Sequence, residues 1–419
     1  MRPRAGGVAR LLSGTGLAAA LLLPAAAPVQ AAPFPGMPTA YGRADGKKGQ
    51  GLPGMPSALD PEAEQAACTP ASREKAKKQD WSRQRLDLDR LHRHSTGAGV
   101  TVALIDTGVA PRAAGLRGRI TAQGAAGDDC VGHGTFLAGL IAGTGGDGSR
   151  LAGVAPGAKV LALRGTDQRG KAGADLVARA VREATAARAG VIAVTAALPR
   201  RDPALTRAVA EARRAGAVVV AAAAPDPPAR AGTDEIPSRT YWPAGEPGVL
   251  SVADMLPSGA RPDGSLPADG IDLAAPGAGV VSGGPRGDGH YLGGGASVAT
   301  AYAAGAAAVV RAARTDASPA AVTRRLTATA YPADIPQLDP YAAVTTVLGD
   351  SGSRVDTDRA AGPVTLRDTS AADRAADRAT FFVLLGTAVV LTILWAAFAL
   401  PRARARGWRP AKAGGAGKE

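Results

Sequence analysis

The stretch Val100-Thr101-Val102-Ala103-Leu104-Ile105-Asp106-Thr107-Gly108-Val109 is an apolar run that ends in an aspartate and a Thr-Gly turn. The run from Val100 to Ile105 has the length and the β-branched content of a buried strand. Open parallel sheets carry their functional side chains at the carboxyl ends of the strands. Asp106 therefore stands where a parallel sheet would place a functional carboxylate.

Further short apolar runs predict strands, and two stretches between them predict helices. The strands are expected at 160–163, 191–194, 218–222 and 249–252, and the helices at 174–189 and 203–214. Both helical stretches carry apolar residues at helical spacing, with Arg and Glu on the other face. This alternation favours an α/β fold in which helices cover both sides of a mainly parallel sheet. The segment 79–348, about 270 residues, is ample for one such domain.

Two other stretches supply a histidine and a serine. His133 lies in Gly132-His133-Gly134-Thr135 and Ser297 in Gly295-Ala296-Ser297-Val298-Ala299, and each begins an apolar helical run. The positive end of a helix dipole near Ser297 would favour negative charge that develops on an attacked carbonyl. In this interpretation His133 takes the Ser297 proton, and Asp106 holds the imidazole tautomer and stabilises its cation. These three residues are the candidate catalytic residues.

The N-terminus has the layout of a secretory signal peptide. Residues 1–31 combine a basic start, an apolar run from Leu17 to Ala27 and a small-residue exit at Val29-Gln30-Ala31. The alternative is an uncleaved N-terminal anchor. The next residues are rich in Pro, Gly and Ala and show little apolar periodicity, so we expect 32–78 to form an extended arm.

A single membrane span is predicted near the other end. Thr380 to Leu400 contains 21 residues without a charge. At about 1.5 Å per residue this length crosses a hydrocarbon core of about 30 Å. The alternative is a buried core helix, but such a helix rarely lacks a polar face over 21 residues. The tail, 401–419, carries six basic residues, which predicts a cytoplasmic tail and an extracytoplasmic body at the cell membrane. Residues 349–379 lose periodicity and are expected to form a linker.

Most of the net charge belongs to the ends of the chain. The signal peptide carries three positive charges of the formal +13 and the tail a net five, which leaves +5 on the exterior part. Aromatic residues are scarce and no basic patch contains them. The composition therefore gives no reason to expect nucleic-acid binding.

The chain contains two cysteines, Cys68 and Cys130. In an oxidising compartment two cysteines most simply form one disulfide, which would hold the N-terminal arm beside His133. Two free buried thiols are the alternative. With two cysteines, no clustered histidines and no Asp-rich loop around Asp226 or Asp254, we expect neither a metal nor another cofactor.

The order Asp, His, Ser separates this chain from chymotrypsin and from the α/β-hydrolases. The chain resembles the subtilisin-like (subtilase, peptidase S8) serine proteases and, among them, the mycosins associated with type VII secretion in actinobacteria. Beyond the three candidate residues, the likeness rests on Trp81, Cys130, Gly153-Val154-Ala155-Pro156-Gly157-Ala158, Leu273-Ala274-Ala275-Pro276-Gly277 and Asp339-Pro340-Tyr341-Ala342-Ala343. The resemblance implies a subtilisin-like three-layer fold. It also implies a membrane-anchored endopeptidase that acts on a polypeptide near a type VII secretion membrane complex.

The chain departs from the subtilase pattern at the oxyanion position. Subtilases continue the strand before the substrate pocket into Gly-Asn, and the Asn side chain donates a hydrogen bond to the oxyanion. Here the strand from Val218 continues as Ala224-Pro225-Asp226-Pro227-Pro228, so that Pro225 falls where the Asn is expected. Proline has neither a side-chain donor nor a backbone N–H. The substrate-binding Ser-Leu-Gly of the family appears as Thr195-Ala196-Ala197.

Two functional classes follow from these observations. The first is an active but slow or narrow serine endopeptidase, which the three retained triad residues favour. The second is a weak or inactive pseudoprotease that serves as a scaffold subunit of the secretion complex, which the missing Asn favours.

Overall fold

The computed structural model describes residues 51–60, 67–145, 151–227, 237–348 and 370–407. The chain divides into a large unit that ends at Leu348 and a second unit from Gly349 onward. The predicted signal peptide, 1–31, lies outside the described residues.

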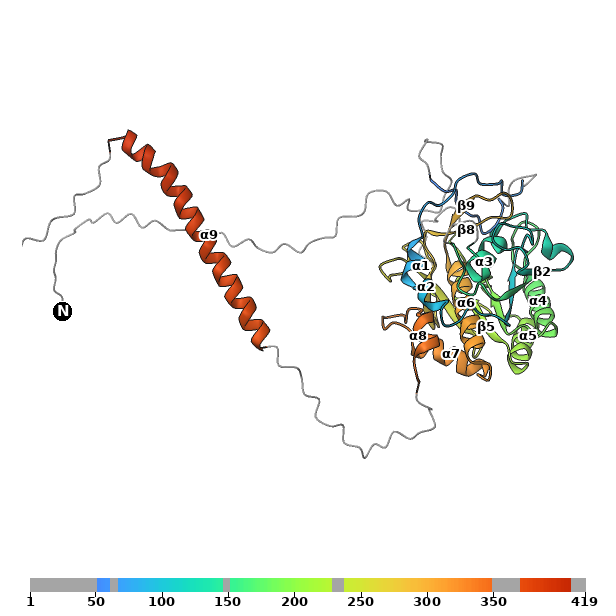
Figure 1. The fold of residues 1–419 in the computed structure, drawn as a ribbon. Helices are drawn as coiled ribbons and strands as arrows, with labels where there is room; N and C mark the ends of the chain where they lie inside the picture. The colour runs from blue at the N-terminus through green and yellow to red at the C-terminus, as the bar shows by residue number, and fades with distance from the viewer. Residues whose placement is uncertain (1–50, 61–66, 146–150, 228–236, 349–369, 408–419) are drawn as a thin grey trace, which may run out of the picture. The chain divides into compact units, whose positions relative to one another are not determined.

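A seven-stranded sheet, parallel throughout, forms the centre of the large unit (Figure 1), with strand order β2-β3-β1-β4-β5-β6-β7. The strands are β1 Thr101–Asp106, β2 Ile120–Ala122, β3 Lys159–Arg164, β4 Val191–Val194, β5 Val218–Ala222, β6 Leu250–Met255 and β7 Leu273–Pro276. A separate antiparallel hairpin consists of β8 Val280–Gly283 and β9 His290–Gly293. All five strands predicted from apolar runs are present. Strands β2, β7, β8 and β9 were not predicted; β2 has three residues, and β7, β8 and β9 each include a Gly or Pro.

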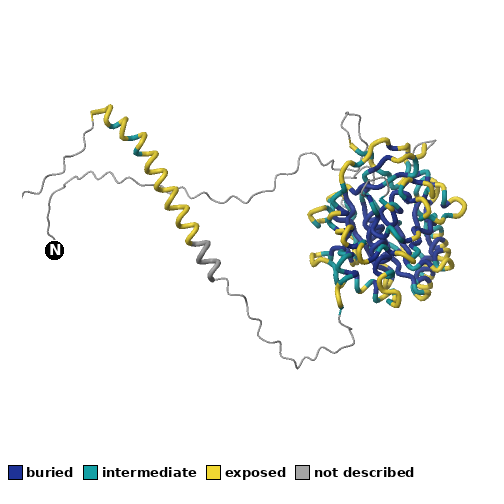
Figure 2. Tube along the Cα trace, in the orientation of Figure 1, coloured by how far each residue is buried: buried dark blue, intermediate teal, exposed yellow. Residues whose placement is uncertain are grey.

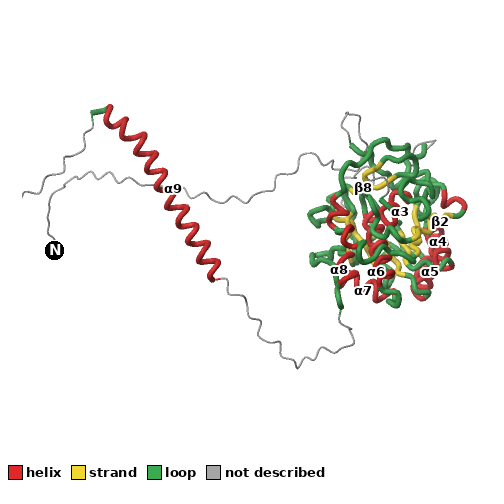
Figure 3. The backbone as a smooth tube through the Cα atoms, in the orientation of Figure 1, coloured by secondary structure: helices red, strands yellow, loops and turns green. Residues whose placement is uncertain are grey.

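Helices cover both faces of the sheet, as Figure 3 shows in colour. On one face Ala103 and Ile105 of β1 pack in a cluster with α4 and α5, and on the other Val102 and Leu104 pack in a cluster with α3 and α6. This division follows from the two-residue period of side chains along a strand. The helices of the unit are α1 Trp81–Arg85, α2 Leu88–Leu91, the 3₁₀ turn η1 Gly124–Gly127, α3 His133–Ala142, α4 Ala174–Ala186, α5 Pro203–Arg214, α6 Ala296–Ala313, α7 Pro319–Ala328 and α8 Pro340–Thr345.

Helix α6 runs through the core of the unit. Every residue from Ala296 to Val310 is buried, and most are Ala or Gly, which let neighbouring backbones approach closely. The helix is long and apolar enough to cross a membrane, but 83% of it is buried within the protein, which identifies it as a core helix. Figure 2 shows this buried interior. The three-layer α/β fold predicted from the sequence is confirmed.

The predicted extended arm, 32–78, is described at 51–60 and 67–78, where it contacts the β8–β9 hairpin. The Met55 N–H donates to the Leu292 carbonyl at 2.7 Å, and the Leu292 N–H donates to the Pro53 carbonyl at 2.8 Å. A disulfide joins Cys68 to Cys130 across 62 residues of sequence. The arm is thus bonded to the segment that precedes His133.

The second unit contains helix α9, Ser370–Ala405. Within its segment Arg378–Ala405, an 18-residue window has a mean hydropathy of 2.4 and no buried residue, so the segment is long and apolar enough to span a membrane. The predicted span, 380–400, lies inside this helix. Residues 370–379 of the predicted linker, 349–379, are helical and form the first part of α9, and the linker itself stays a prediction. These residues, Ser-Ala-Ala-Asp-Arg-Ala-Ala-Asp-Arg-Ala, are rich in alanine, the strongest helix former, and alanine gave no apolar periodicity to recognise.

Candidate active site

The fold brings together the three residues singled out in the sequence. Asp106 ends β1, His133 is the first residue of α3 and Ser297 is the second residue of α6. Nδ1 of His133 lies 3.0 Å from both carboxylate oxygens of Asp106, and Nε2 of His133 lies 3.1 Å from Oγ of Ser297. All three side chains are buried. This is the geometry in which a base removes a hydroxyl proton while a carboxylate orients the base.

Asp106 accepts hydrogen bonds from several neighbours besides His133. The Thr107 N–H donates to its Oδ1 at 2.7 Å and the Thr107 hydroxyl at 3.0 Å, while the Thr195 hydroxyl donates to its Oδ2. Burial by itself would raise the pKa of Asp106. The charge and hydrogen bond of His133, with the donors Thr195 and Thr107, outweigh burial and hold that pKa below its ordinary value. Asp106 is therefore an ionised partner for His133.

A second buried acid, Asp129, fixes the start of α3. Its carboxylate accepts the Gly132 N–H at 2.7 Å, the Thr135 N–H at 2.8 Å and the Thr135 hydroxyl at 2.6 Å, and it also accepts the Thr107 hydroxyl at 2.9 Å. Gly132, the N-cap of α3, has no side chain with which to accept the free N–H groups of the helix end. Asp129 supplies that acceptor and so orients His133. This role was not predicted from the sequence, because Asp129 lies three residues before the N-cap and outside the position at which a capping acid is recognised.

The loop after β5 places a carboxylate, that of Asp226, against Ser297. Its Oδ1 accepts the Ser297 N–H at 3.0 Å, and its Oδ2 accepts the Ser297 hydroxyl at 2.6 Å. The same Oδ2 lies 3.5 Å from Nε2 of His133. The sequence analysis put Pro225 opposite the family's Asn and considered Asp226 only as a calcium ligand. In the structure it is Asp226, one residue beyond Pro225, whose side chain reaches Ser297.

Glycine is required where α6 meets Asp226. Gly295 has φ +113°, and a Cβ at this position would lie 2.1 Å from Oδ1 of Asp226. Any larger residue would displace the carboxylate and strain the backbone. Glycine at the entry to this helix therefore makes room for Asp226.

The imidazole of His133 lies between two carboxylates with opposite pKa shifts. Burial raises the pKa of Asp226, and the nearby Asp254 adds to this, against the lowering effects of His133 and the two Ser297 donors. Burial would lower the pKa of His133, but Asp106, with Asp226 and Asp129, raises it to about 9. The resting site therefore favours a protonated His133 at neutral pH.

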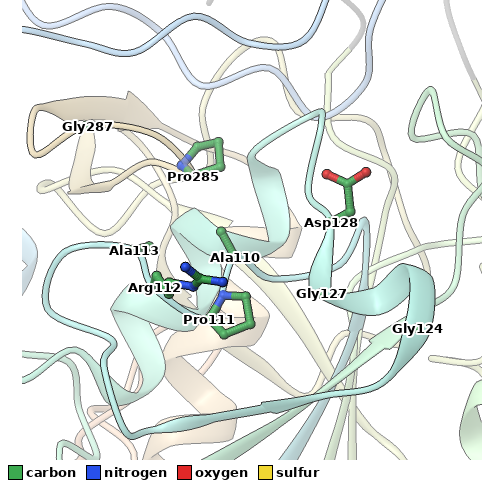
Figure 4. Close-up of a pocket in the computed structure, with 9 residues that line it drawn as sticks. All are labelled: Ala110, Pro111, Arg112, Ala113, Gly124, Gly127, Asp128, Pro285 and Gly287. Atoms are coloured by element: carbon green, nitrogen blue, oxygen red, sulfur yellow. The ribbon is translucent and has the colours of Figure 1, made fainter.

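The surface of the large unit contains a hollow of about 560 Å³ (Figure 4). Its walls come from the loop after β1, from the turn before α3 and from the β8–β9 hairpin, and include Arg112, Asp128 and Pro285. Mixed charge and small residues make it a candidate subsite for a substrate side chain.

Within the described residues, no group of three or more His, Cys, Asp or Glu side chains is placed to hold a metal ion. The two acids considered as calcium ligands have protein partners instead. Asp254 pairs with Arg261 at 3.1 Å, and Asp226 accepts the Ser297 donors.

Comparison with known proteins points to one family. The model of the subtilase family matches residues 97–373. Mycosin-3 of Mycobacterium tuberculosis is 32% identical over an alignment of 312 residues, and the match covers 59% of this chain and 66% of mycosin-3. Mycosin-4 of the same organism is 32% identical over an alignment of 416 residues, and the match covers 86% of this chain and 90% of mycosin-4.

Solved structures give the same picture. MycP1 from Mycobacterium smegmatis superposes with a TM-score of 0.60 at 26% identity, covering 69% of this chain and 91% of MycP1. The MycP3 protease from the type VII (ESX-3) secretion system has a TM-score of 0.60 at 29% identity, covering 70% of this chain and 97% of MycP3.

Proposed function

The chain belongs to the subtilase family as a subtilisin-like serine protease of the mycosin type, and from this premise we propose that Asp106, His133 and Ser297 are its catalytic triad. The observation that carries the proposal is the chain of contacts from Asp106 through His133 to Ser297, at 3.0 and 3.1 Å. The positions at the carboxyl end of β1 and at the starts of α3 and α6 support it.

In the proposed reaction Oγ of Ser297 attacks the carbonyl carbon of a peptide bond and passes its proton to Nε2 of His133. Asp106 keeps the Nδ1–H tautomer and stabilises the imidazolium. His133 then protonates the leaving amine as the C–N bond breaks, and water hydrolyses the acyl-enzyme by the same route. The Ser297 N–H, near the start of α6, donates to the oxyanion.

Labelling with a fluorophosphonate tests this proposal, because the probe bonds only to an activated serine. Purified full-length protein is expected to take one label, at Ser297, and Ser297→Ala is expected to take none. Labelling that persists in Ser297→Ala would place the nucleophile elsewhere.

A specific observation favours a second candidate function, that of a pseudoprotease scaffold. The Ser297 N–H and hydroxyl both donate to Asp226, so neither is free for substrate in this structure. A protein that takes no label at any pH, yet is needed for assembly of a secretion complex, would support the scaffold.

We further propose that the protein acts on polypeptides at a type VII secretion complex, from outside the membrane. The support is that MycP3 is a protease of the type VII (ESX-3) secretion system and that this chain is similar to it. The apolar length of α9 and the arginines that end it, Arg402 and Arg404, support a single span with a cytoplasmic C-terminus.

Protease shaving of intact cells tests this orientation. An epitope tag after Glu419 is expected to survive shaving, while the large unit is degraded. As a control, lysed cells should lose the tag as well. Loss of the tag from intact cells would contradict the orientation.

A further inference from the structure

The side chain that faces the nucleophile is an acid where subtilases carry an amide. An oxyanion forms about 3 Å from its donors, one of which is the N–H of the nucleophile. The Ser297 N–H is bonded to Oδ1 of Asp226, so the oxyanion must form next to this carboxylate. An ionised Asp226 would repel it, whereas a protonated Asp226 has an O–H to donate.

The hydrogen bonds of the resting site show where that proton is available. In the form with a protonated His133, its Nε2–H donates to Ser297 Oγ over 3.1 Å, and the Ser297 hydroxyl donates to Asp226 Oδ2 over 2.6 Å. If the Nε2 proton moves to Ser297 Oγ while the hydroxyl proton moves to Oδ2, the result is a neutral His133 beside a neutral Asp226. The two forms contain the same number of protons and differ only in their position.

We propose that Asp226 is a catalytic residue of this protease, the oxyanion donor, and that it acts as a neutral carboxylic acid. This inference rests on the proposed triad function. The active form is then the second of the two forms above, with one proton on Asp226 and a free Nε2 on His133.

Acylation from this form conserves all protons and electrons. The Asp226 O–H turns from Ser297 to the carbonyl oxygen of the substrate, and the Ser297 N–H joins it there. As the Oγ–C bond forms, the carbonyl π electrons move to oxygen, and the Ser297 proton goes to His133. The C–N bond then breaks with transfer of that proton to the amine, and Asp226 keeps its own proton throughout.

The charges around Asp226 favour this assignment. His133 faces it from α3, and Ser297 is its neighbour on α6. Asp254 of β6 repels a carboxylate at position 226 and is itself paired with Arg261 at 3.1 Å. Beyond His133 lie the further acids Asp106 and Asp129. Among the described residues, the charge of His133 favours the ionised form of Asp226, and the charge of Asp254 favours the neutral form. Burial also favours the neutral form.

The proposal predicts a bell-shaped pH profile. At low pH both Asp226 and His133 are protonated, and His133 cannot accept the serine proton. Above about pH 9, the pKa of His133, the pair has lost its shared proton, and a carboxylate occupies the oxyanion site. Activity is therefore confined to the interval between, where the pair holds one proton.

The test measures the second-order rate constant of fluorophosphonate labelling against pH for the full-length protein, from about pH 4 to about pH 10. The parent protein should lose its labelling rate as the pH rises through about 9. Asp226→Asn, which donates at every pH, should instead rise through a single histidine ionisation and stay high. Near neutral pH it should label faster than the parent, by up to about 10²-fold, because only the fraction of the parent with its proton on Asp226 has the donor, and one such donor in subtilisin contributes about 10²–10³.

Three further variants separate the roles of Asp226. Asp226→Ala has neither charge nor donor, so it should lack the alkaline fall but label more slowly than Asp226→Asn at every pH. Asp316→Asn removes an exposed acid in the α6–α7 loop and should match the parent. Ser297→Ala should not label at all. Thermal unfolding of each variant shows whether it is folded.

Each other outcome decides against the proposal. Parent and Asp226→Asn profiles of the same shape would overturn the role of Asp226 and leave the triad intact. An unreactive parent with a reactive Asp226→Asn would show that Asp226 only blocks a competent triad. Absence of label from both would overturn the proposed function, and this inference with it.

Discussion

Asp106 and Asp226 lie on opposite sides of His133. Asp106 is buried and the Asp226 side chain is 11% exposed, yet the pKa of Asp106 is lowered and that of Asp226 is raised. Asp106 has donors from Thr107 and Thr195 in addition to His133. For Asp226 the described donors come from Ser297, and Asp254 repels it. Desolvation raises the pKa of both carboxylates. The charge of His133, whose Nδ1 lies 3.0 Å from both Asp106 oxygens but whose Nε2 lies 3.5 Å from Asp226, together with the Thr195 and Thr107 donors, keeps Asp106 charged.

The segments around Asp106 are joined by more bonds than the loop that carries Asp226. On the Asp106 side, the four bonds of Asp129 and the Cys68–Cys130 disulfide connect β1, α3 and the arm. On the Asp226 side, the acid follows the end of β5 in a loop between two prolines. Asp106, the charged acid that orients His133, thus lies where hydrogen bonds and the disulfide connect several segments. Asp226, the acid proposed to exchange a proton, lies in a loop.

Asp106→Asn should produce the largest effect. An amide cannot hold the Nδ1–H tautomer as a carboxylate does, and the equivalent change in a serine protease lowers turnover about 10⁴-fold. Labelling of Ser297 by a fluorophosphonate should fall to a similar extent at the optimal pH. The same chemical change at Asp226 should raise the rate near neutral pH. Equal losses at both sites would remove the distinction between the two acids.

Of these two acids, the role of Asp106 was predictable from the sequence and that of Asp226 was not. The hydrophobic pattern predicted the five central strands and the helices after His133 and Ser297, because burial on both faces leaves apolar runs. Asp106, His133 and Ser297 each follow or begin such a run, so their meeting was predictable. Asp226 lies in a proline-rich loop, 71 residues before its partner Ser297, and no local pattern encodes that contact.

The path of that loop explains why Pro225, and not Asp226, was placed at the position of the family's Asn. A strand end gives a position only to within a residue or so, and the path of the chain beyond β5 decides which side chain turns toward Ser297. Asp129 was missed for a related reason: its four partners belong to two segments, and a cap formed by a residue before the N-cap has no simple sequence signature. Both residues became visible only through tertiary contacts.

Removal of the disulfide should have the next largest effect and tests the Asp106 side directly. For a separation of 62 residues the chain-entropy model gives a stabilisation of about 4 kcal/mol. Cys68→Ser/Cys130→Ser should lose about that free energy of unfolding, measured by denaturant titration of the full-length protein in detergent. The parent should show no free thiol when alkylated under denaturing, non-reducing conditions. Quantitative alkylation of the parent would contradict the bridge.

Thr195→Val should have the smallest effect and concerns a single donor to Asp106. The valine removes the hydroxyl that bonds Oδ2 of Asp106 and the Ile105 carbonyl. A hydrogen bond to a charged group contributes about 1.5–3 kcal/mol, and the variant should lose about that much stability at neutral pH. Because the folded pKa of Asp106 is depressed, its contribution is present above the unfolded pKa of about 4 and is lost as the pH falls below it.

The difference between parent and Thr195→Val should therefore shrink in acid. Thr195→Ser keeps the hydroxyl and is the matched control, expected to lie close to the parent across the pH range. If serine and valine were equally destabilising at neutral pH, the packing of the Thr195 methyl group would be the cause. Asp106 would then owe its low pKa to His133 and Thr107, and the contrast with Asp226 would rest on fewer donors than the structure shows.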